Sequence, residues 1–323
     1  MSTFESLLRS TASRLVHLLL VLLAVSVLTF VMLDQLPGDA ALVLGSMDST
    51  ASEIEELRHQ MGLDEGVAQR YFTWLAKVVT GDWGESFATG ETTLGAIGLR
   101  FPVTLELMVL SLFLALLMAV FAAIVSARNP GGRADRMLGT IAFGSLAIPA
   151  FVMAILLVGI FSIWLGWFPT LGFVSVQEGL LANLHSMALP VLSIAMIEWV
   201  PLYRVLRGDL IATLDEEFIL LARAKGLSDA EVLIKHALRP SMITLITVLG
   251  LQVGHLIGGA LVIEIVFALP GMGETLIMAI YNRDLFIVQG CILVITLGYV
   301  FTNIAVDWLL VWLDPRIRTG GRL

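Results

Sequence analysis

Six long stretches of the chain lack Lys and Arg and nearly lack Asp and Glu, and this limits the fold more than any other feature. A helix needs about 20 mostly apolar residues to cross the hydrocarbon core of a bilayer. Five stretches hold no charged residue, and the sixth holds only Glu198. The predicted spans are residues 15–33, 107–127, 137 to about 164, about 183–203, 241–263 and 285–306.

The composition agrees with a membrane protein. Of the 323 residues, 58% are hydrophobic and 14% charged, against roughly 25% charged in an average soluble domain. No stretch alternates as a barrel strand does, so the fold class predicted is an all-α integral membrane protein with six transmembrane helices. The net charge of −8 argues against a nucleic-acid partner. Cys291, the one cysteine, excludes a disulfide framework and a cysteine-based metal site.

The distribution of basic residues predicts that both termini are cytoplasmic. Fourteen of the 19 Lys and Arg residues fall in the segments that a cytoplasmic N-terminus places inside. The first stretch could instead be a cleaved signal peptide, because Arg9 and Arg14 precede it. An uncleaved anchor is favoured, since Asp34 to Gly38 follow without a small-x-small cleavage site.

Three parts are expected: an N-terminal anchor helix (1–33), an external loop (34–101) and a membrane domain with five spans (102–323). In the external loop, Ser52 and Glu55 fit a helix-capping box. Residues 65–79 form a second amphipathic stretch, which Gly81 and the residues after it break. These two helices either pack on the membrane surface or help to dock an external partner.

Between the fourth and fifth spans, residues 213–240 predict two short cytoplasmic helices separated by a break at Gly226. Thr213 with Glu216, and Ser228 with Glu231, fit capping boxes. Basic residues in the last turn before a C-terminal glycine suit the helix dipole. The side chains of Phe218, Ile219 and Ala222 would then form a compact knob for a soluble partner. A mere connector on the membrane surface is an equal alternative.

The sequence resembles a family along nearly its whole length. Glu217-Phe-Ile-Leu-Leu-Ala-Arg-Ala-Lys-Gly-Leu-Ser and His236-Ala-Leu-Arg-Pro240 resemble the cytoplasmic EAA loop of permease subunits in binding-protein-dependent ABC importers of the dipeptide, oligopeptide and nickel branch. Further matching segments are Leu36-Pro-Gly-Asp39, Gly81-Asp-Trp-Gly-Glu-Ser-Phe87, Phe101-Pro-Val-Thr-Leu-Glu-Leu107, Glu264-Ile-Val-Phe-Ala-Leu-Pro-Gly-Met-Gly273, Asn282-Arg-Asp284 and Asp314-Pro-Arg-Ile-Arg318. We call residues 213–240 the EAA loop. The family glutamate falls at Leu220, and the family glycine at Gly226.

The resemblance implies an inner-membrane permease that forms half of a translocation pore for peptides or related small solutes. Its implied partners are a second homologous permease, two cytoplasmic ATPases, an external solute-binding protein and membrane lipid. The chain has no phosphate-binding P-loop, so no cofactor is expected on it, and ATP and Mg²⁺ belong to the ATPases. The coupling residues implied are Phe218, Ile219, Ala222, Arg223, Ala224, Lys225, Gly226, Leu227, His236 and Pro240.

Polar residues within the spans are candidates for the translocation path, because a charge in hydrocarbon is costly unless it faces a cavity or a partner. Glu198 could line the pore or pair with Arg204 or another group. Gln252 and His255 share a helical face, which meets either the pore or a neighbouring helix. Glu264 lies near the outer end of its span, where a water-reaching carboxylate is the alternative.

The fifth span also carries Gly250, Gly254 and Gly258, a stripe that permits close helix packing within the chain or with the second permease.

Other functional classes fit less well. The five histidines are scattered, and neither an H-E-x-x-H nor a G-x-S-x-G motif is present, so no metal site and no enzyme are expected. A stand-alone secondary transporter is the alternative, but it has no need of an ATPase-gripping loop. The identity of the solute is left open by the sequence, because selection by this branch resides largely in the binding protein.

Overall fold

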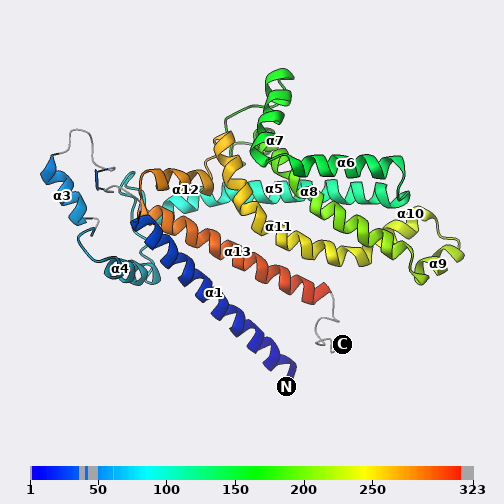
Figure 1. Cartoon of the computed structure of the whole chain (residues 1–323), viewed down its shortest axis with the longest axis horizontal. Helices are drawn as coiled ribbons and strands as arrows, with labels where there is room; N and C mark the ends of the chain where they lie inside the picture. The colour runs from blue at the N-terminus through cyan, green and yellow to red at the C-terminus, as the bar shows by residue number, and fades with distance from the viewer. Residues whose placement is uncertain (1, 36–40, 43–49, 61, 314–323) are drawn as a thin grey trace. The chain divides into compact units, whose positions relative to one another are not determined.

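The computed structural model describes residues 2–35, 41–42, 50–60 and 62–313, and these parts are almost entirely helical (Figure 1). Their only β feature is an isolated bridge between Glu85 and Thr92. The helices are α1 (Ser2–Asp34), α3 (Ala51–Gln60), α4 (Val67–Val79), α5 (Thr93–Arg128), α6 (Arg133–Ala147), α7 (Ala150–Leu157), the π-helical η1 (Val158–Trp164), α8 (Leu180–Leu214), α9 (Glu217–Ala224), α10 (Asp229–Glu231), the π-helical η2 (Val232–Ala237), α11 (Leu238–Phe267), α12 (Met272–Tyr281) and α13 (Leu285–Leu313). The all-α prediction is confirmed.

Four described helical segments are long and apolar enough to cross a membrane, and up to six spans result if two bent helix pairs each count as one. The unbroken segments are Thr93–Arg128, Leu180–Leu214, Asp229–Gly254 and Leu285–Ala305. The apolar part of α1, Leu18–Asp34, is shorter. An integral membrane protein with four to six spans is therefore the architecture, and the topology of six spans with cytoplasmic termini stays a prediction.

The predicted third span, residues 137–164, is not one straight helix. It consists of α6 followed by α7 and η1, which are bent by 108°. The break falls at Ile148 and Pro149, where Ile148 has φ −100° and ψ 121°. A proline clashes with a helical conformation of the residue before it and pushes that residue towards extended backbone. Continuous hydropathy concealed this bend.

The described chain divides into two compact units, the first of which comprises Met1–Val103 and Pro270–Val300. In this unit α4 turns its apolar face to α1, where Phe30, Tyr71 and Trp74 are almost fully buried together. The rings of Phe30 and Tyr71 meet edge to face with centroids 5.5 Å apart. Ser26 and Tyr71 share a hydrogen bond of 2.8 Å between their hydroxyl groups, and Arg70 pairs with Asp34 at 2.8 Å. The amphipathic face predicted in this loop is thus occupied by α1.

A second contact of this unit joins two of the motifs singled out in the sequence. Ser86, in the turn before α5, donates a hydrogen bond to the carboxylate of Asp284, which precedes α13. The rings of Phe87 and Phe286 stack beside it with centroids 5.5 Å apart. Burial raises the pKa of the Asp284 carboxyl, while the hydrogen bond from Ser86 acts in the opposite direction. Segments almost 200 residues apart in the sequence are therefore held by a buried polar contact.

The second unit comprises Thr104–Leu269 and Phe301–Leu323. Its core is a face of α5 made of small residues that packs on large residues of α8. Both sets lie in one buried cluster: Ala115, Ala119, Ala122, Ala123 and Ala127 of α5, with Trp199, Tyr203, Leu206 and Leu210 of α8. The hydroxyl groups of Ser126 and Tyr203 are hydrogen-bonded at 2.9 Å across this contact.

Two capping predictions are wrong. The N-terminus of α3 is capped by Thr50 and Glu53, since the Thr50 amide donates to Glu53 at 2.7 Å; the Ser52–Glu55 box is shifted by two residues because both pairs fit the same pattern. Thr213 does not cap a helix with Glu216, because α8 continues to Leu214 and the Thr213 hydroxyl lies 3.3 Å from that of Ser241. In the remaining predicted box, Ser228 accepts a hydrogen bond from the amide of Glu231 at 3.3 Å.

Candidate functional site

The EAA loop folds as a helix, a break and a second helical segment. Helix α9 ends at Ala224, and Gly226 follows with φ +85°. The amide of Gly226 donates to the carbonyl of Arg223 at 2.9 Å, and that of Leu227 donates to Ala222 at 3.4 Å. This is the left-handed C-terminal cap that a glycine provides without strain. After the break, α10 and η2 run directly into α11.

Helix α9 presents two different apolar faces. Ile219 has no exposed surface and Ala222 is 6% exposed, because both pack with Val232 and Leu233 in the core of the second unit. The predicted knob therefore needs correction: of its three residues, only Phe218 is exposed. The exposed apolar side chains of α9 are Phe218, Leu220 and Leu221, at 47%, 58% and 57%. We call these three residues the α9 ridge.

The other coupling residues surround the break. Arg223 reaches Asp229 across it at 3.6 Å, and both side chains are largely exposed. Ala224, Lys225 and Pro240 are exposed, whereas Leu227 and His236 are half-buried. The two helical parts of the EAA loop are therefore held together mainly by the buried side chains of α9. Surface ion pairs add little, because each contributes about 0–1 kcal/mol.

A buried ion pair that sequence reasoning missed lies in the same unit. Arg207 of α8 donates two hydrogen bonds to Asp135 of α6, from Nε to Oδ1 and from Nη2 to Oδ2, each at 2.6 Å. The Gly131 amide donates to the same carboxylate at 2.7 Å. Asp135 is 6% exposed. The sequence offered one signal for this pair. Asp135 is the one acidic residue between Arg128 and Arg136, and Arg207 follows the apolar part of α8.

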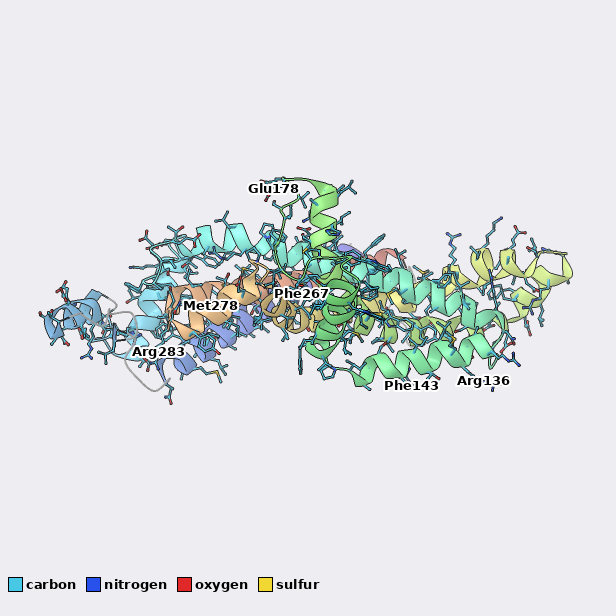
Figure 2. The ribbon with its side chains drawn as sticks, turned by 90° about the horizontal axis from the view of Figure 1, so that it is seen from above. Arg136, Phe143, Glu178, Phe267, Met278 and Arg283 are labelled. Atoms are coloured by element: carbon cyan, nitrogen blue, oxygen red, sulfur yellow. The ribbon has the colours of Figure 1, made fainter. Side chains whose placement is uncertain are left out.

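Of the intramembrane candidates, Glu198 and Gln252 meet. The Gln252 amide Nε2 donates to Glu198 Oε2 at 2.6 Å, joining α8 to α11. The predicted alternative of a Glu198–Arg204 pair receives no support, because the Arg204 guanidinium lies over the ring of Phe143, 5.2 Å from its centroid; Figure 2 labels Phe143 on α6. The side chain of His255 lies outside the described residues.

Glu264 departs from expectation. Its carboxylate has no exposed surface and accepts a hydrogen bond from the hydroxyl of Thr104 at 2.6 Å. Both residues belong to the second unit. Because Glu264 is enclosed by its own chain, the alternative of a water-reaching carboxylate receives no support, and a place on the translocation path stays a prediction.

The glycine stripe of α11 has three environments: Gly250 is buried, Gly254 half-buried and Gly258 exposed. Intrachain packing therefore accounts for Gly250, while contact of Gly258 with the second permease stays a prediction. In the part of the chain that the structure describes, no group of three His, Cys, Asp or Glu side chains is placed to hold a metal ion.

An all-helical chain with several helices that can cross a bilayer is an integral membrane protein, and the comparisons with known proteins define it further. Residues 115–319 match the family described as binding-protein-dependent transport system inner membrane component, and residues 7–108 match the N-terminal family of such components. The chain belongs to this family. It is therefore a multi-pass inner-membrane permease of an ABC importer, it works with an ATPase and a binding protein, and it is not itself catalytic.

Similar proteins cover nearly the whole chain. A protein of Brucella abortus (strain 2308) named as a peptide transport system permease is 35% identical over 298 residues, which is 92% of this chain and 95% of the relative. The glutathione transport system permease of Escherichia coli (strain K12) is 35% identical over 312 residues, or 97% and 99%. Among solved structures, a chain of the MetNI methionine ABC transporter in an inward-facing conformation matches with a TM-score of 0.55 and 16% identity, over 68% of this chain and 96% of that one. This last likeness concerns the fold alone.

Proposed function

We propose that this chain forms one half of the pore of an ATP-driven importer for peptides or related small solutes. The relatives of matching length are named for peptide and glutathione transport, and this supports the solute class. In the proposed assembly a second related permease completes the pore, two cytoplasmic subunits bind ATP and Mg²⁺, and an external binding protein delivers the solute. A stand-alone secondary transporter is not favoured by the family.

The topology proposed has six spans with both termini in the cytoplasm. It places the EAA loop inside, together with the basic residues of the short loops. The same arrangement puts the segment 34–101 outside, where a binding protein docks.

The observation that carries the proposal is the division of α9 into a buried and an exposed apolar face. Ile219 and Ala222 anchor the helix in its own unit, so the α9 ridge is held on a fixed support. Three exposed apolar side chains within four residues are expected to be covered in the working complex. We assign this ridge to a cleft of an ATPase, with Leu220 making an apolar contact where the family glutamate would make a polar one.

Helix α9, packed on its own unit through one face and bound by an ATPase through the other, would transmit movement of the ATPase to the membrane domain. Because α10 and η2 lead without a loop into α11, displacement of the EAA loop would act on the spans directly. The role proposed for Gly226 is to set the angle at which α9 meets this segment.

The angle is tested by Gly226→Val. A β-branched residue in the left-handed conformation costs about 1–2 kcal/mol, so we expect normal membrane insertion but loss of ATP-driven uptake of dipeptides and glutathione into vesicles. Retention of the ATPases on purification should weaken. Gly166→Val is the matched control, because Gly166 has φ +65° and open space around its α-carbon but lies between η1 and α8. Full uptake by Gly226→Val would contradict the coupling role and show that the EAA loop is only a connector.

The ridge is tested by Leu221→Ser. This side chain is 57% exposed, so its removal should leave the fold intact while ATPase retention and uptake fall. Leu181→Ser, at an 83% exposed position at the start of α8, should leave both unchanged. Equal behaviour of the two variants would contradict the assignment of the ridge to an ATPase.

A further inference from the structure

A carboxylate in the middle of one candidate span meets an amide of the helix packed against it. Glu198 is the nineteenth of the 35 residues of α8, and Gln252 is the fifteenth of the 30 residues of α11. At 1.5 Å per residue, each lies about 20 Å or more from either end of its helix. The hydrogen bond of 2.6 Å between them therefore lies near the middle of the α8 span, whereas Gln252 is the third residue from the end of the candidate span Asp229–Gly254.

The Glu198 charge has no cationic partner among the described residues. Its one hydrogen bond comes from Gln252 through Oε2, and Arg204 is engaged with the ring of Phe143. Burying a carboxylate without a counter-charge is costly in a span. A cation supplied from outside this chain would remove that cost.

The surroundings favour an accessible group over one sealed in helix packing. Residues 186–203 of α8 include no exposed position, since α8 is covered by other helices of its unit, yet Glu198 itself is only half-buried. Gln252 is 8% exposed and is held by its own packing. It fixes one carboxylate oxygen and leaves Oε1 for another donor.

The backbone beside Glu198 adds an acceptor. Pro201 lies within α8 and has no N–H, so it cannot donate the helical hydrogen bond to the carbonyl of Ile197, four residues earlier. The helix therefore leaves one backbone carbonyl without its usual donor, one residue before Glu198 in the sequence.

We propose that Glu198, oriented by Gln252, is a mid-membrane subsite for the ammonium or guanidinium group of the transported solute. This inference rests on the proposed function and adds that the importer favours solutes with a positive charge. An ammonium has three N–H donors and a guanidinium five. Either pairs with Oε1 and neutralises the carboxylate while the solute passes.

The experiment uses the complete complex, purified with its partners and placed in lipid nanodiscs. A water-soluble carbodiimide modifies carboxyl groups that water reaches, and mass spectrometry follows the rate at each residue. The probes are N-acetyl-tri-arginine amide and its uncharged counterpart N-acetyl-tri-citrulline amide, which has nearly the same shape. Glu178, which Figure 2 labels in the exposed segment before α8, is the internal control.

We expect Glu198 to be modified, and the arginine probe to slow its modification about tenfold more than the citrulline probe does, a difference of about 1.4 kcal/mol. Neither probe should change the rate at Glu178. In Gln252→Leu the carboxylate loses its orienting donor, so protection should fall while modification continues.

Two results would overturn the subsite. One is a Glu198 that resists the reagent while Glu178 reacts, because the carboxylate is then sealed in helix packing. The other is equal protection by both probes. ATPase activity and subunit composition are measured on the same sample, so an assembled, ATP-hydrolysing complex with an unprotected Glu198 rejects the subsite and leaves the proposed function standing.

Discussion

The buried ion pair between Asp135 and Arg207 should contribute measurably to the stability of the second unit. The change to test is Asp135→Asn, which keeps the size of the side chain and removes its charge. An amide accepts through one oxygen only, so at least one of the two hydrogen bonds of 2.6 Å from Arg207 is lost, and any that remains no longer joins opposite charges. Removing one partner of a buried pair costs about 3–5 kcal/mol when the other charge stays enclosed.

The partial exposure of Arg207 makes the expected cost smaller than this. Arg207 is 33% exposed against 6% for Asp135, so water partly solvates the guanidinium that the variant leaves unpaired. We therefore expect a loss of about 2 kcal/mol, which is roughly a thirtyfold change in an equilibrium constant. Since the chain has two units, the quantity to follow is the inactivation half-life of the detergent-solubilised complex at a fixed temperature.

The matched control is Lys235→Met, which removes an exposed pair with Glu231 at 2.7 Å on the same unit. Pairs of this kind contribute about 0.3–0.5 kcal/mol. A double-mutant cycle with Arg207→Met isolates the coupling between the two buried charges. If the Asp135 and Arg207 effects are additive, or if Asp135→Asn costs no more than Lys235→Met, the reasoning is refuted.

Three further changes test packing, strain and titration. In Gly290→Ala the new Cβ would overlap Thr93 Cγ2, so thermal stability should fall by about 1–3 kcal/mol, and Thr93→Ser should restore it in the double variant. Ala268 has φ +48° at the end of α11, so Ala268→Gly should prolong the half-life at fixed temperature, with a gain of about 0.5–1 kcal/mol. Asp284 has a raised pKa in the folded state; its stability contribution is therefore complete below the unfolded pKa and lost as pH rises through the folded pKa. Ser86→Ala removes a hydrogen bond that lowers this pKa, so the stability lost between pH 4 and pH 8 in thermal unfolding should be larger than in the parent, and an unchanged pH dependence would count against the contact.

Short sequence patterns predicted those features of the fold that depend on neighbouring residues, such as helix ends. Gly226 follows a helix with basic residues in its last turn, and it adopts the left-handed conformation expected there. The same reasoning was two residues in error at α3, because Thr50 and Ser52 both start an S/T-x-x-E pattern and only the surrounding backbone selects between them. Hydropathy overlooked the bend at Pro149, since a proline changes direction without changing apolarity.

Contacts between distant segments were beyond such reasoning. The burial of Ile219 and Ala222 depends on Val232 and Leu233, which the break at Gly226 brings back against α9. Asp135 and Arg207 are 72 residues apart, and each had an ordinary local explanation as part of a charged loop. Glu198 and Gln252 were each recognised as costly polar groups, but only the packing of α8 on α11 reveals that they are partners.

The π-helical segment η2 gives the junction between the EAA loop and α11 a particular mechanical property. A π-helix holds more residues in each turn than an α-helix, and single π turns inside α-helices are frequent at functional sites. Conversion of residues 232–237 to α-helical geometry would shift the register by about one residue, which turns α10 about 100° around the axis of α11. Conversion of this one turn between π and α geometry would therefore rotate α9 and α10 relative to α11. The helical connection from α10 through η2 to α11 would stay unbroken.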